Sequence, residues 1–141
     1  MQRKAGDTVA EQLFGVVSNY SNMIVGCLEA KDPHLRQSAI YKVPDLKSEK
    51  TARRLPLLFD DPYVLTGSYQ HSEGSISVPV PPRQVCDYAA QAFNEVVPES
   101  PAFGGKTDEQ QMKSIAAVSR WWQTNRDSLV WDSNRGILKL K

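Results

Sequence analysis

Residues 32–39 read Asp-Pro-His-Leu-Arg-Gln-Ser-Ala and give the clearest start of a helix in the chain. Asp32 suits the capping position because its carboxylate can accept a hydrogen bond from a free backbone N–H. Pro33 suits the first helical position, where its missing N–H is not needed. The spacing of the following residues predicts a helix to about residue 43, stopped by Pro44. The apolar residues expected on its inner face are Leu35, Ala39 and Val43.

Apolar residues recur at helical spacing over most of the remaining chain. We expect further helices over residues 8–29, 48–59, 82–97 and 108–125, with a kink or a new start at Pro56. The residues expected to face inward are Val9, Leu13, Val16, Tyr20, Ile24 and Leu28 in the first of these helices, Ala52, Leu55, Leu58 and Phe59 in the second, Val85, Ala89, Phe93 and Val96 or Val97 in the third, and Met112, Ile115, Val118 and Trp122 in the fourth.

Two segments break the helical pattern. Residues 62–82 are rich in proline, glycine and serine and predict one long inserted loop. Residues 129–140 contain two short apolar runs around a polar stretch, which predicts a small C-terminal hairpin with a five-residue turn over 132–136. We therefore expect one domain over residues 1–141, all-α apart from this hairpin and built from about five helices.

Composition narrows the classes of partner. The 141 residues carry 17 Lys and Arg against 16 Asp and Glu, so the net charge of +1 does not favour nucleic acid or an anionic membrane. The long uncharged stretch over residues 13–28 contains serine and asparagine and is too polar to span a membrane. We expect a soluble chain, cytoplasmic if it is full length, and secreted or periplasmic if a signal was removed.

The sequence contains few candidate catalytic or metal-binding side chains. Cys27 and Cys86 show no CxxC spacing, so buried free thiols are expected. His34 and His71 lack the spacing of a metal site, and we expect no metal and no cofactor. The least favoured hypothesis is a small enzyme. Such an enzyme would use Cys86 with one of the histidines, or the acidic pair Asp60 and Asp61.

Residues 104–107 read Gly-Gly-Lys-Thr, which resembles the end of a phosphate-binding loop. The position where such a loop needs its first glycine holds Ser100, and nearby prolines remove backbone donors that a phosphate would use. Thr107 and Gln110 instead have the spacing of a capping box, as do Thr8 and Glu11. The motif therefore predicts a helix start and not a nucleotide site.

The Asp-Pro motif recurs at Asp61-Pro62, 29 positions after Asp32-Pro33, and Leu-Pro-Leu-Leu stands before it at residues 55–58. With residues 83–90 and the Trp-rich end of the chain, these segments resemble HEAT repeats, in particular the terminal part of uncharacterised bacterial HEAT-like proteins. The resemblance implies helix pairs stacked into a short α-solenoid whose end units cover apolar faces. It implies no catalytic residues.

The function expected from these features is a non-catalytic protein-binding module, of which a bacterial immunity or inhibitor protein is one specific version. Tyr63, Tyr69 and His71 are candidate contacts because such amphipathic side chains are enriched at interfaces. The alternative is nucleic-acid binding through a basic helix face. The residues of that face are Lys47, Lys50, Arg53 and Arg54. The oligomeric state stays open.

Overall fold

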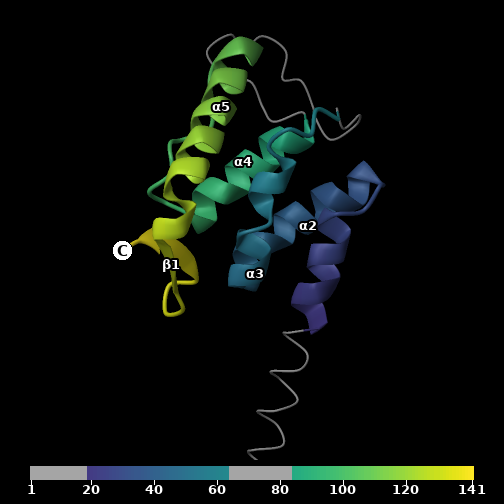
Figure 1. The fold of residues 1–141 in the computed structure, drawn as a ribbon. Coiled ribbons are helices and arrows are strands. Elements are labelled where there is room, and N and C mark those ends of the chain that lie inside the picture. Colours follow the sequence, from purple (N-terminus) through teal and green to yellow (C-terminus); the bar gives the residue numbers. More distant parts are fainter. Residues whose placement is uncertain (1–18, 64–83) are drawn as a thin grey trace, which may run out of the picture.

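A computed structural model describes residues 19–63 and 84–141 (Figure 1). The described part is mostly helical and ends in a small antiparallel strand pair. The first helical segment covers residues 19–28. The elements that follow are α2 (Pro33–Leu46), α3 (Glu49–Ala52), the 3₁₀-helix η1 (Leu55–Leu58), α4 (Val85–Val96), α5 (Asp108–Asn125), the 3₁₀-helix η2 (Arg126–Ser128), β1 (Leu129–Asp132) and β2 (Ile137–Leu140).

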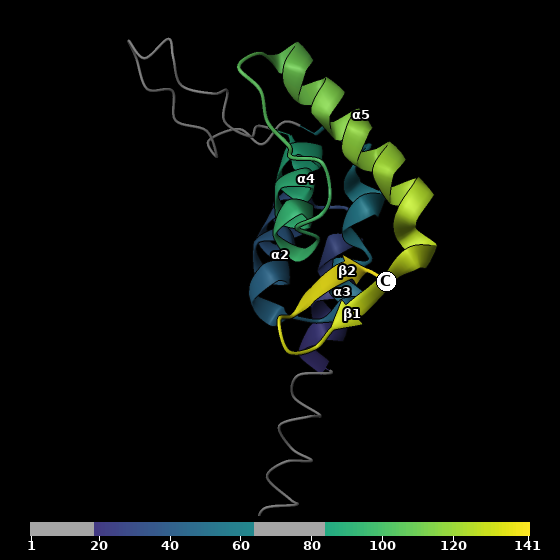
Figure 2. The same ribbon diagram turned by 90° about the vertical axis from the view of Figure 1, so that its left-hand side faces the viewer.

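Helix α4 forms the centre of the fold. α2, η1, α5 and β2 all contact it, and Figures 1 and 2 show α4 lying between α2 and α5. Its sequence explains this position, because nine of its twelve residues are buried. The inward residues expected for this helix are confirmed, although the helix begins at Val85 and not near residue 82. Phe93 joins the layers through edge-to-face contacts with Phe59 at 5.3 Å and Trp122 at 5.7 Å between ring centroids.

Helix α2 begins as the sequence predicts but ends later. The side chain of Asp32 accepts a hydrogen bond from the backbone N–H of His34 at 2.9 Å. Pro44 lies inside the helix, which continues to Leu46, so the predicted stop at residue 43 is wrong. Proline is tolerated there because it stands in the last helical turn, where only one intrahelical hydrogen bond is lost.

Leu35 was expected to face inward and is 48% exposed. The buried residues of α2 are Ala39, Ile40 and Val43. At about 100° per residue, the centre of this stripe passes through Arg36, and Leu35 lies about 90° away from it. The inner position of the first turn therefore belongs to an arginine, a placement that a hydrophobic pattern does not predict.

The segment after α2 confirms the prediction for residues 48–59. Ser48 precedes α3, and Pro56 stands in the first turn of η1, so the proline marks a new start. The residues expected to face inward are buried: Ala52, Leu55, Leu58 and Phe59. In the first helical segment, Ile24 and Leu28 are buried and Tyr20 is 36% exposed. The other predicted features of that helix, from Thr8 to Val16, lie outside the described residues.

Helix α5 has the predicted bounds, and Thr107 caps it by accepting a hydrogen bond from the Gln110 N–H at 3.1 Å. The Gln110 side chain returns a bond to the N–H of Lys106, one residue earlier than a capping box would place it. Ile115 and Val118 are buried as expected, and Trp122 packs against the core. Met112 is 67% exposed, contrary to the prediction, because Gln111 and not Met112 continues the buried stripe of Ile115 and Val118.

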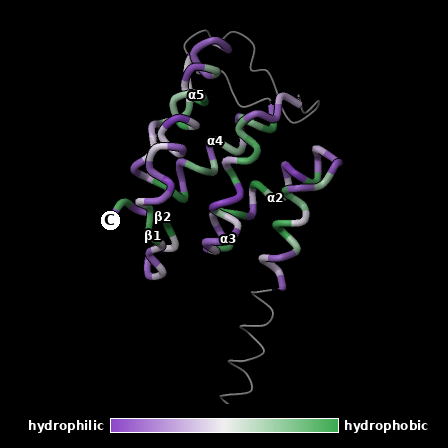
Figure 3. Tube along the Cα trace, viewed as in Figure 1, coloured by the Kyte–Doolittle hydropathy of each residue, from purple (hydrophilic) through white to green (hydrophobic). Residues whose placement is uncertain are grey.

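The C-terminal hairpin is confirmed, so the part of the chain that the structure describes is helical with one strand pair and is not strictly all-α. β1 pairs antiparallel with β2, with Leu129 opposite Leu140. The turn has four residues, 133–136, because Asp132 belongs to β1. Gly136 closes the turn at φ 67°, the left-handed region that glycine adopts without strain. Leu129 and Leu138 are buried in the core and attach the hairpin to it. Figure 3 shows hydrophobic residues on both strands.

Candidate functional site

A groove with a volume of about 470 Å³ lies between α5 and the segment that joins η1 to α4. One wall comes from α5 and the other from residues 59–62, with the first residues of α4 at its base. The lining residues are Phe59, Asp60, Pro62, Gln84, Cys86, Met112, Ile115, Ala116, Ser119 and Arg120. The surface of the groove is more apolar than polar.

Backbone hydrogen bonds fix the wall opposite α5. The N–H of Val85 donates to the carbonyl of Tyr63 at 3.0 Å, and the N–H of Cys86 donates to the carbonyl of Asp61 at 2.9 Å. The Gln84 side chain adds a bond from Nε2 to the carbonyl of Pro62 at 3.1 Å. The two ends of the described chain, at 63 and at 84, are therefore held together on the groove rim.

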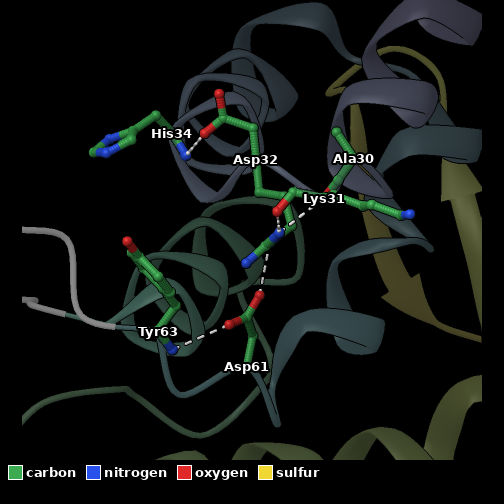
Figure 4. A network of polar contacts seen from close by, with 7 residues as sticks. Ala30, Lys31, Asp32, His34, Asp61 and Tyr63 are labelled. Atoms are coloured by element: carbon green, nitrogen blue, oxygen red, sulfur yellow. Dashed lines mark hydrogen bonds and ion pairs between the residues drawn. The ribbon is translucent and has the colours of Figure 1, made fainter.

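Arg36 attaches this wall to α2. Its Nε lies 2.7 Å from Oδ2 of Asp61, and both side chains are about 15% exposed. Nη1 of the same guanidinium donates to the carbonyls of Ala30 and Lys31 at 2.8 and 2.9 Å (Figure 4). The contact between Nε and Asp61 is ionic, since among the described residues this Nε has no hydrogen bond of acceptable angle. One cation thus joins the turn before α2 to the groove wall.

Cys86 contributes a thiol to the groove, and its surroundings keep that thiol protonated. Burial, followed by the negative charge of Asp87, raises the pKa of Cys86 to about 12. The side chain is free, as is that of Cys27, which is only half-buried. A thiol with this pKa is a poor nucleophile near neutral pH, because the thiolate is the reactive form. The arrangement does not favour catalysis by Cys86.

The polar groups at the groove include two exposed charges, Asp60 on one wall and Arg120 on the other. Neither forms an ion pair or a side-chain hydrogen bond with another residue of the described part. The neighbouring acid, Asp61, is committed to Arg36. The sequence pair Asp60-Asp61 therefore consists of one structural acid and one acid open to solvent, and the two do not form a carboxylate dyad.

The structure describes one of the three predicted interface residues. Tyr63 is 47% exposed and stands at the groove rim beside Pro62. Its N–H donates to Oδ1 of Asp61 at 3.1 Å, which positions the residue. Tyr69 and His71 lie outside the described residues, as does most of the predicted loop over 62–82. His34 is exposed, and its backbone N–H binds Asp32.

The basic side chains near α3 take part in intramolecular contacts. Arg53 pairs with Glu49 at 2.8 Å and donates to the carbonyl of Leu129 at 3.0 Å. Arg54 pairs with Glu29 at 3.1 Å. Lys50 bonds to Asn22. These contacts orient the cations toward the protein itself, and they weaken the case for a basic surface that binds nucleic acid.

The sequence pattern does not predict the groove, although α5 carries a signal for it. Met112, Ile115, Ala116 and Ser119 recur at steps of three, one and three, so they share one face of the helix, and three of the four are apolar. Within the described ranges, no three metal-binding side chains gather, and no helix is long and apolar enough to cross a membrane.

No protein-family model, curated protein or solved structure matches this chain.

Proposed function

We propose that the protein is a non-catalytic protein-binding module and that the groove between α5 and residues 59–62 is its docking site. The observation that carries the proposal is Met112, which lines the groove and is 67% exposed on a fixed helix. Methionine adapts its shape to apolar partners and is frequent at binding surfaces. Half-exposed Tyr63 extends the same surface at the rim.

A protein segment suits this site better than a small molecule. Small-molecule sites bury most of the ligand and bring several polar groups together on it. In this groove the Gln84 side chain is occupied by Pro62 and the Cys86 thiol is protonated, while the charged residues are exposed. An apolar side chain of a protein partner would cover the floor of the groove, and the neighbouring residues of the partner would remain at the rim of the groove.

A HEAT-like arrangement remains part of the proposal, and two local features support it. Asp32 and Asp61, the acids of the two Asp-Pro motifs, each accept a hydrogen bond from the N–H two residues later, at 2.9 and 3.1 Å. Arg36 of the first motif pairs with the Asp of the second. An immunity or inhibitor protein would be one specific form of such a binding module.

The test is selection of peptides from a random 15-residue display library on the immobilised full chain, followed by affinity measurement by fluorescence anisotropy. We expect selected peptides to lose at least tenfold in affinity on Met112→Glu, because the charge would be buried against the partner. Lys113→Glu is the matched control, since it lies next in the helix and outside the groove lining. Peptides that bind both variants like the wild type would contradict the proposal.

A further inference from the structure

Asp60 and Arg120 occupy opposite walls of the groove, and covering the groove changes the surroundings of both charges. In the free protein each is exposed and hydrated. An apolar partner that fills the space beside Phe59 and Ile115 would remove water from these charges without replacing it. Loss of hydration without a compensating partner is costly for a carboxylate or a guanidinium.

Residues 19–63 and 84–141, which the structure describes, supply no such compensation. Neither Asp60 nor Arg120 has an ion-pair partner among the described residues, and the two do not pair with each other across the groove. The nearest other acid of that wall, Asp61, is held by Arg36 at 2.7 Å. A molecule that occupies the groove would offset this cost if it brought a counter-charge to each of them.

We infer that the partner is a peptide segment with an apolar side chain between one basic and one acidic residue, the base facing Asp60 and the acid facing Arg120. The inference rests on the proposed docking site and adds the charge pattern of its occupant. Because the two charges come from different walls, they also fix the direction in which the segment lies. Arginine on α5 favours a carboxylate in particular, since its planar group can bind two oxygens at once.

The experiment exchanges the two charges and leaves the net charge unchanged. Peptides are selected from the random display library on the wild-type chain, and their affinity is measured for Asp60→Arg/Arg120→Asp. The control is Glu109→Lys/Lys113→Glu, which exchanges an exposed ion pair on the same helix, 3.2 Å apart in the wild type and outside the groove lining. Both variants alter exposed side chains only, so we expect both to fold.

The expected result is enrichment of peptides that carry both charges around an apolar residue. Such a peptide should bind the Asp60/Arg120 exchange variant at least tenfold more weakly, and exchange of its own two charges should restore the affinity. The control variant should bind like the wild type. These three results together support the inference.

Two results would overturn the charge pattern. If affinity depends on Met112 but not on the Asp60/Arg120 exchange, the docking site stands and the inference fails. If the wild type is a dimer that Arg120→Asp dissociates, a second copy and not a peptide segment occupies the groove. Peptides that depend on neither Met112 nor the exchanged charges would remove the proposed function itself, and the inference with it.

Discussion

The guanidinium of Arg36 lies 2.7 Å from the carboxylate of Asp61, and it joins the first Asp-Pro motif of the chain to the second. Asp61 in turn offers its backbone carbonyl to the N–H of Cys86, at the first turn of α4. A single ion pair thus connects α2, the groove wall and the central helix. Its two side chains are about 15% exposed, so solvent screens it less than it would an ion pair on the surface.

Loss of this ion pair should destabilise the fold. We expect Asp61→Asn to lower the free energy of unfolding by about 2–3 kcal/mol, because Arg36 would keep its charge in a mostly buried position without a counter-charge. Urea denaturation measures this change. Asp60→Asn is the neighbouring control and should change the free energy by less than about 0.5 kcal/mol, since Asp60 is exposed. Equal effects of the two substitutions would refute the role given to Arg36.

Two glycines should respond to alanine in opposite directions. At Gly136 the backbone has φ 67°, and an added Cβ would lie 2.7 Å from the Lys47 side chain. We expect Gly136→Ala to destabilise by about 1–2 kcal/mol, mostly from the left-handed backbone, because the lysine chain can move. Gly26 is helical, and no atom of the described residues lies within 4 Å of its Cβ position, so Gly26→Ala should stabilise by about 0.5–1 kcal/mol. Thermal denaturation of both variants checks the signs.

The Cys86 thiol should make stability fall at alkaline pH. Its pKa is raised to about 12 in the folded protein from the ordinary value of 9.0. Between these values the unfolded chain releases the proton and the folded chain keeps it. Stability should therefore be intact below pH 9 and decrease as pH rises above it, by at most about 1.4 kcal/mol per pH unit. Urea denaturation of wild type and Cys86→Ala at pH 8 and 10 isolates this contribution, and identical pH dependence would contradict it.

Asp132 should titrate at lower pH than an ordinary aspartate. The N–H of Arg135 and the charge of Lys139, whose Nζ lies 3.5 Å away, lower the pKa of its carboxyl group. The stabilisation of the turn is therefore present above the ordinary pKa and is lost as pH falls through the lowered one. An NMR titration of the side-chain carboxyl carbons should show Asp132 titrating below its ordinary value, and Lys139→Ala should raise its midpoint. A midpoint at the ordinary value would show that the turn does not hold the carboxylate.

The fold was predictable where local signals were strong. Helix α5 has the expected bounds because Thr107 supplies its cap, and the hairpin was expected because two apolar runs flank a polar turn that ends in Gly136. Met112 and Leu35 were misplaced for one reason. Apolar periodicity does not assign an inner position to a polar residue, yet Arg36 holds such a position in α2 and Gln111 holds one in α5.

The groove could not be predicted from spacing because its residues come from three separate parts of the chain. Phe59 and Asp60 follow η1, Cys86 belongs to α4, and Met112 to Arg120 lie on α5. Only packing brings these parts together. The role of Asp61 could not be predicted either, because nothing in the sequence distinguishes it from its neighbour Asp60. The two acids differ in role because Asp61 contacts Arg36.

If partners dock in the groove between α5 and residues 59–62, binding should leave an NMR footprint on those residues. A display-selected peptide is added to the ¹⁵N-labelled chain, and the shifts of the backbone amides are mapped. We expect the largest shifts at 112, 115, 116, 119 and 120, together with 59, 60 and 84–86. Shifts centred on 47–54, on the basic side of α3, or spread without a maximum at the groove would contradict it.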